Sequence, residues 1–191
     1  ASDLVLDAQM GIGHTDSPLL ISADRLSAKT TLKDLRIANG AFDETGETVI
    51  SQLVAEGTID LTSAGSVKVQ GDAVANQAIN IHITPGAYGG QLHLAETAQV
   101  IAQDGPLQLF ASESIRTEFG SLLKSNENIN LEIGSTAGMP ANQAQLNLSG
   151  TIHSAELRAD AGKPGQYVQL TITHLIGLAG DPLPVFLNRF H

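Results

Sequence analysis

The chain has 191 residues, and its 10 Lys and Arg against 20 Asp and Glu give a formal net charge of −10. This sign argues against nucleic acid and anionic membrane surfaces as partners, and the absence of Cys excludes disulfides, thiolate metal sites and thiol nucleophiles. Hydrophobic residues make up 42% of the chain but aromatic residues only 4%. We therefore expect a core of Ile, Leu, Val and Ala, and no membrane insertion, because no apolar run approaches the roughly 18 residues of a membrane span.

Aliphatic residues alternate with other residues in short groups along the whole chain, a period that indicates strands with one buried face. The groups are Leu4/Leu6, Ile59/Leu61, Val67/Val69, Ile79/Ile81/Ile83, Leu92/Leu94, Leu107/Leu109, Ile129/Leu131/Ile133, Leu146/Leu148 and Val168/Leu170/Ile172. Helical spacing is scarce. Residues 31–37 fit a helix or a strand that ends at Asn39-Gly40. The pattern predicts an all-β chain.

Corner chemistry separates the all-β alternatives, which are a sandwich, a barrel and a solenoid. Most corners are single Gly, Ala, Asn or Ser residues, whereas hairpins favour two-residue Asn-Gly or Asp-Gly connections. The steps from Leu107 through Ile129 and Leu146 to Val168 indicate coils of about 20 residues each, and roughly nine coils in all. We predict a right-handed parallel β-helix with about three short strands per coil, and a sandwich remains the alternative.

The two ends of the chain resemble each other at a constant offset in numbering, without a gap, over residues 4–26 and 168–190. The identical pairs are Leu6/Leu170, Ile12/Ile176, Gly13/Gly177, Pro18/Pro182, Leu19/Leu183 and Arg25/Arg189. We predict a single β-helical segment, residues 1–191, which contains one repeat of about 164 residues and the start of the next. Neighbouring repeats and end-to-end self-association are the expected contacts of its ends.

The segment over residues 10–28, with Met10-Gly11-Ile12-Gly13 near its start, resembles a recurring segment of filamentous-haemagglutinin-like adhesins. These are giant bacterial surface exoproteins exported by two-partner secretion. Residues 56–69 and 146–157 look like the short coil repeats of the same proteins. The resemblance implies a right-handed parallel β-helix, a secreted or cell-surface location, and adhesion, receptor contact or a stalk role. Any export signal would then lie outside this segment.

The sequence carries only weak signatures of metal binding or catalysis. His82 and His93 point outward on their strands and could bind a metal only if they stacked on adjacent rungs, but eleven residues, about half a coil, separate them. We therefore expect surface histidines and no metal site. No paired Asp-Asp, Arg-x-Lys or G-x-S-x-G signature is present, so we predict no catalytic residues, no cofactor and no enzymatic activity.

Four segments break the coil rhythm and are the expected sites of recognition on a rigid rod: residues 38–48, 84–90, 135–143 and 161–166. The two tyrosines, Tyr88 and Tyr167, lie in or beside them and are the candidate ligand contacts, although a ring that closes the side of the tube is the simpler interpretation.

The predicted function is a non-catalytic repeat module of a secreted bacterial surface exoprotein. It would serve as an adhesin shaft or would present a receptor-binding face to a protein or glycan on a host or neighbouring cell. The alternatives are a polysaccharide-active lyase or hydrolase on the same fold and a self-associating filament protein.

Overall fold

The computed structural model describes residues 2–40, 46–85, 90–134, 145–161, 169–177 and 184–188, and every regular element in them is a β-strand. Sheet A contains β1 (Asp3–Ala8), β3 (Arg25–Thr30), β5 (Glu47–Ala55), β7 (Ser66–Ala75), β9 (Gln91–Leu94), β10 (Gln99–Ala102), β12 (Ser114–Thr117), β13 (Leu122–Ser125), β15 (Gln145–Ser154) and β17 (Gln169–Gly177). Sheet B contains β2 (Leu19–Ile21), β4 (Leu35–Gly40), β6 (Ile59–Ala64), β8 (Ile79–Thr84), β11 (Leu107–Ala111), β14 (Asn128–Ile133), β16 (Glu156–Ala161) and β18 (Val185–Asn188). Among the described residues, no helix is long and apolar enough to cross a membrane.

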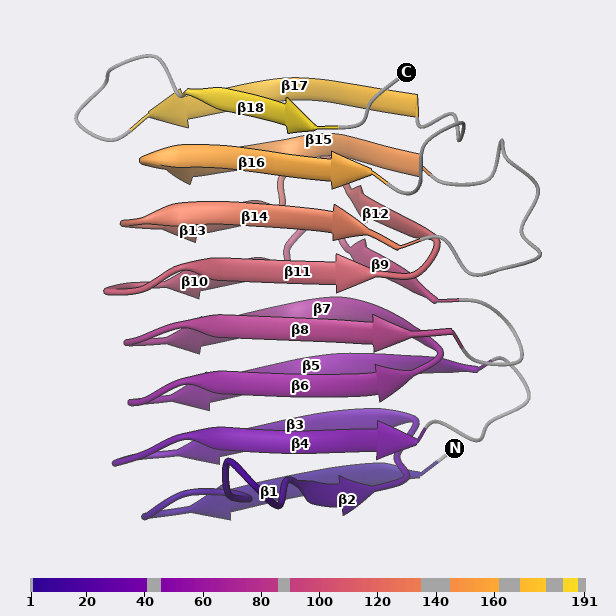
Figure 1. The fold of residues 1–191 in the computed structure, drawn as a ribbon. Helices are drawn as coiled ribbons and strands as arrows, with labels where there is room; N and C mark the ends of the chain where they lie inside the picture. The colour runs from indigo at the N-terminus through magenta and orange to yellow at the C-terminus, as the bar shows by residue number, and fades with distance from the viewer. Residues whose placement is uncertain are drawn as a thin grey trace.

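The chain coils into a parallel β-solenoid, as predicted. Neighbouring strands within each sheet are parallel, and successive strands of one sheet come from successive coils. In Figure 1 the strands of sheet B run to the right in front, and those of sheet A return behind them as the chain rises from its N-terminus. The coils therefore wind in the right-handed sense, which is the usual sense for parallel crossovers.

Sheet A has two forms of rung, where a rung is the level that one coil occupies. In β5, β7 and β15 a single strand of 9 or 10 residues crosses the sheet. In the coils between β7 and β15 the same width is covered by two short strands, β9 with β10 and β12 with β13. These two coils have three short strands, as predicted, whereas coils such as β5–β6 and β7–β8 have two, one in each sheet.

The interior is a set of aliphatic ladders that run along the solenoid. One ladder in sheet B joins Ile59, Ile79, Leu107, Ile129 and Leu157, which are all 0% exposed. Rungs in a sheet stack at about 4.8 Å, so each side chain contacts the equivalent one above and below it. This geometry suits branched aliphatic side chains and accounts for the shortage of aromatic residues.

Coil length varies although the register of sheet B is uninterrupted. The ladder positions 59, 79, 107, 129 and 157 follow one another in alternately shorter and longer steps, so the predicted constant spacing of about 20 residues per coil is wrong. The spacing mixes two sheets, because Leu107 and Ile129 lie in sheet B, whereas Leu146 lies in sheet A in register with Ile115. Residues 31–33 form a bend, and the strand begins at Leu35 and continues through Asn39-Gly40.

The corners are closed by specific polar and glycine residues. Asn39 is buried, accepts a hydrogen bond from the Ala23 N–H at 2.9 Å, and donates to the Ala23 carbonyl at 2.9 Å and to Thr48 Oγ1 at 2.7 Å. Gly65 has a φ of +102°, and a Cβ there would lie 2.5 Å from the carbonyl oxygen of Gly46. The Asn39 side-chain amide therefore satisfies the Ala23 N–H and carbonyl, which turn away from the sheets. The corner at Gly65 requires glycine because of its positive φ and the nearby carbonyl.

The N-terminal end of the solenoid is open. Strands β1 and β2 each pair with one described strand only, and the inward side chains of β1, Leu4, Leu6 and Ala8, are half-buried against the core. Leu19, which is in register with the buried Ile37, is 38% exposed. No described segment folds across this end.

The two copies of the internal echo begin in the same sheets. β1 and β17 belong to sheet A, and β2 and β18, which follow them, belong to sheet B. A true repeat would place Ile12 and Ile176 at equivalent corners, but the structure does not: Ile12 is buried in the corner and bridges to Leu35 of sheet B, whereas Ile176 lies within β17, in register with His153 of sheet A. Pro18 directly precedes β2, as a strand-opening proline would. Pro182 and Arg189 lie outside the described residues, so a tandem repeat over residues 1–191 stays a prediction.

Candidate functional site

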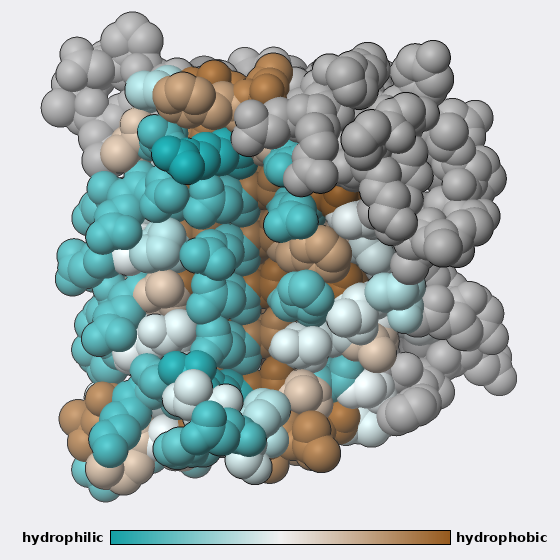
Figure 2. All heavy atoms as spheres, viewed as in Figure 1, coloured by the Kyte–Doolittle hydropathy of each residue, from teal (hydrophilic) through white to brown (hydrophobic). Residues whose placement is uncertain are grey.

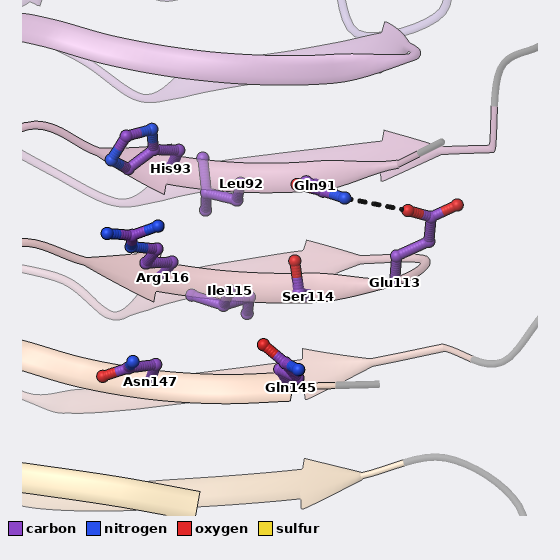
Figure 3. A pocket seen from close by; sticks show the side chains of 9 residues that line it. All are labelled: Gln91, Leu92, His93, Glu113, Ser114, Ile115, Arg116, Gln145 and Asn147. Carbon is purple, nitrogen blue, oxygen red and sulfur yellow. Dashed lines mark hydrogen bonds between the residues drawn. The ribbon is translucent and has the colours of Figure 1, made fainter. Parts of the chain in front are cut away.

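A polar hollow of about 390 Å³ lies on the outer face of sheet A, across β9, β12 and β15 (Figure 3). Its polar lining comes from Gln91, His93, Glu113, Ser114, Arg116, Gln145 and Asn147, and inward-facing Leu92 and Ile115 complete its floor. The hollow is therefore built from three successive rungs.

Strand alternation and register place these side chains in two columns. Gln91, Ser114 and Gln145 are cross-strand neighbours and form one column, and His93, Arg116 and Asn147 form the other. The residues between the columns point into the core, because Leu92 and Ile115 are both 0% exposed. The column of His93, Arg116 and Asn147 continues to Lys68 of β7, which is in register with His93.

The carboxylate of Glu118 holds His93. The two side chains meet at 2.7 Å between His93 Nε2 and Glu118 Oε1, and the other oxygen of Glu118 accepts a hydrogen bond from the Glu96 N–H at 3.1 Å. The hydrogen bond with His93 lowers the pKa of Glu118 below its usual range, and the Glu96 N–H and the charge of Arg116 act in the same direction. Glu118 is therefore an anion that fixes the orientation of the ring.

Arg116 carries the available positive charge of the hollow. It is exposed and forms no hydrogen bond or ion pair with any described residue. His93 and Asn147 flank it in the column, and Figure 3 shows the three side chains on the same side of the hollow. A guanidinium with amide neighbours can bind a carboxylate or a pair of hydroxyl groups in a bidentate manner.

The two carboxylates near the hollow lie apart. Glu113 accepts a hydrogen bond from Gln91 Nε2 at 3.2 Å at the end opposite His93, whereas Glu118 bonds to His93 itself. Ser114 is in register with Gln91 and forms no hydrogen bond with His93. Within the described ranges, no group of three or more His, Asp and Glu side chains could hold a metal ion.

The two candidate histidines lie on different faces, as expected. His93 is in sheet A, and His82 is in sheet B, where its ring stacks on Phe110. The candidate ligand contacts Tyr88 and Tyr167 lie outside the described residues. Two of the segments chosen as recognition loops, residues 84–90 and 135–143, come just before β9 and β15, the outer rungs of the hollow.

Sequence reasoning missed Arg116, Gln145 and Asn147. Each occupies an outward position of an alternating strand, a signal that the sequence does carry. Which of them would lie beside His93 depends on coil lengths that the sequence does not reveal.

Comparison with known proteins gives no relative: no family model matches the chain, and neither the curated proteins nor the solved structures contain a match.

Proposed function

We propose that this chain is a non-catalytic segment of a bacterial surface exoprotein of the filamentous-haemagglutinin type, secreted and displayed as part of a rod. In this role it continues into neighbouring coils at its ends and presents its lateral faces to a protein or glycan receptor on another cell. Neither nucleic acid nor a membrane interior is a partner in this proposal.

The observation that carries the proposal is the open N-terminal end. The inward positions of the first coil are occupied by Leu4, Leu6 and Leu19, which are the residue types that fill the ladders further along. A terminal coil that faces water normally has a cap or a polar outer face. Apolar residues at inward positions favour a further coil of the same kind as the natural covering of this end.

The sequence resemblance supports the proposed exoprotein type, and the hollow on sheet A supports receptor contact. Residues 10–28, which carry the resemblance, form the first corner, β2 and the start of β3. The hollow supplies three amides, a hydroxyl and a guanidinium that no described residue binds, which is a set suited to contact, and its His93 and Glu113 side chains bond to Glu118 and Gln91, respectively, at opposite ends. Adhesion needs such surface groups, and the two carboxylates near the hollow lie too far apart to act on one bond together.

The open end is tested by sedimentation velocity on the whole chain over a range of concentrations. We expect end-to-end association, stronger at high salt because salt screens the repulsion between chains of net charge −10. Leu19→Lys should abolish it, because the lysine would lie at an inward position of the contact. Phe119→Lys is the matched control, since Phe119 is 83% exposed on the side of the rod. A chain that stays monomeric throughout would remove the main support.

A polysaccharide-active enzyme is the second candidate, and the His93–Glu118 pair beside Arg116 is the observation that favours it. Lyase and hydrolase assays on pectin and alginate test it directly. We expect no turnover. Turnover that is lost in both His93→Ala and Arg116→Ala would replace the non-catalytic proposal.

A self-associating filament is the third candidate. It predicts long ordered polymers in electron micrographs of the isolated chain, whereas a shaft segment should give short, concentration-dependent oligomers.

A further inference from the structure

A second hollow, on the opposite face of the solenoid, crosses β8, β11 and β14 of sheet B and has a volume of about 450 Å³. Two outward columns border it. One consists of Asn80, Gln108 and Asn130, and the other of His82, Phe110 and Glu132. Figure 2 shows a hydrophobic strip between two columns of mostly hydrophilic side chains, and this strip runs along the solenoid axis. We call this hollow the axial groove.

Two stacked rings fix one wall of the axial groove. The centroids of His82 and Phe110 are 4.2 Å apart and their planes differ by 8°. The Phe110 ring also packs over Gly134, where a Cβ would lie 2.4 Å from Phe110 Cζ. The Phe110 ring is therefore held between His82 and Gly134, so this part of the wall is formed before any ligand binds.

The opposite wall is a ladder of amides. Gln108 is exposed and forms no hydrogen bond with any described residue, so both its donor and its acceptor are available. Asn80 donates to Asp60 Oδ1 at 2.5 Å and Asn130 accepts from Asn128, and no described residue binds the Asn80 carbonyl or the Asn130 amide hydrogens. Each wall position recurs at the rung spacing of about 4.8 Å, which suits a ligand that repeats along a line.

The charges beside the groove disfavour an anionic ligand. Glu132 is exposed and unpaired among the described residues. The two nearby arginines are occupied: Arg36 bonds to Asp34 and Asp60, and Arg158 bonds to Glu156. A ligand in the groove therefore meets free amides and a carboxylate acceptor, and no free cation from the described residues.

We propose that the axial groove binds a linear, uncharged glycan that lies parallel to the solenoid axis. Its hydroxyl groups would exchange hydrogen bonds with the amide ladder and donate to Glu132, and its C–H groups would contact the His82 and Phe110 rings. The groove takes a glycan of about three sugar units, because it spans three rungs at the strand spacing. This site is separate from the hollow on sheet A, where Arg116 offers a cation that the described residues do not supply at the groove.

The test is isothermal titration calorimetry of the whole chain with uncharged hexasaccharides of β-1,4-glucan, β-1,3-glucan, α-1,4-glucan and β-1,4-mannan. Hexagalacturonate is the anionic comparison. We expect at least one uncharged hexamer to bind more tightly than the anionic one. Gln108→Ala should weaken that binding about threefold to tenfold, the loss of one or two hydrogen bonds, and Phe110→Ala should weaken it more than about tenfold.

Gln103→Ala is the matched control, since Gln103 is exposed in a turn of another face and its loss should leave binding unchanged. Circular dichroism checks that each variant folds, and Gln108→Ala keeps the test valid if Phe110→Ala does not. Absence of binding to every uncharged hexamer, preference for hexagalacturonate, or affinity that Gln108→Ala leaves unchanged would each overturn the proposal.

Discussion

The middle of the solenoid and its first coil use the same alternation of residues with very different results. In β6, β8 and β11 the inward Ile and Leu side chains are at most 2% exposed. In β1 the equivalent leucines are only half-buried, although they point the same way. Burial in this fold therefore depends on the coils above and below, and a strand pattern acquires its hydrophobic stabilisation only within a stack.

The largest effect should come from a core truncation in the middle. Ile81→Ala removes a side chain that is 1% exposed and leaves a cavity between two rungs, so we expect a loss of about 2–5 kcal/mol in the free energy of unfolding in urea. Leu6→Ala in the first coil should cost less than half as much. Equal losses would mean that the first coil is covered in solution.

A smaller effect should follow from the loss of a buried corner amide. Asn39→Ala leaves the Ala23 N–H and carbonyl without their partner, and we expect a loss of about 1–3 kcal/mol in urea denaturation. Gln103→Ala, on an exposed turn, should change stability by less than about 0.5 kcal/mol. An equally mild Asn39→Ala would show that water replaces the amide.

Asp34, Arg36 and Asp60 form a polar cluster between the second and third coils, which should make the free energy of unfolding depend on pH. Burial alone would raise the pKa of Asp34, but the hydrogen bond from the Thr58 N–H and the Arg36 guanidinium outweigh it, and the pKa is lowered. The contribution of Asp34 is therefore complete above its unfolded pKa of about 4 and is lost as the pH falls through its lower folded value.

Asp34→Asn should remove that part of the acid dependence. At neutral pH we expect a cost of only about 0.2–1 kcal/mol, because this ion pair is partly exposed. Urea denaturation at several values between pH 2 and 7 measures both effects, and parallel curves for the two proteins would contradict the assignment.

The smallest effect should come from an outward position of the first coil. Leu20 is 77% exposed, so Leu20→Lys should change the free energy of unfolding by less than about 0.5 kcal/mol. A larger loss in thermal or urea unfolding would indicate that another chain contacts this side of the end.

The strand interior could be predicted from sequence, and the surface site could not. The triplet Ile129/Leu131/Ile133 alternates cleanly, and all three residues are buried. In β7 the alternation breaks at Gln70-Gly71, so one long strand was not recognised, and its irregularity is visible only as a register shift opposite β5.

The hollow on sheet A depends on contacts between residues that are distant in the sequence. His93 is in register with Arg116 on the next rung, yet it bonds to Glu118, which lies beyond the end of that strand. Sequence periodicity showed that His93 faces outward. It could not show which carboxylate reaches it, because that contact is made by a turn between two short strands.

The variable coil length has a consequence for how such a chain can change. The step from β6 to β8 is shorter than the step from β8 to β11, yet Ile59, Ile79 and Leu107 remain in one ladder. The segments that pass from sheet B to sheet A differ in length, from Gly65 alone between β6 and β7 to residues 134–144 between β14 and β15. This corner tolerates added residues without altering the register of sheet B. A guest peptide inserted there should be displayed along one edge of the rod, so the corner is the natural place to engineer new specificity and a place where evolution can change length at little cost to folding.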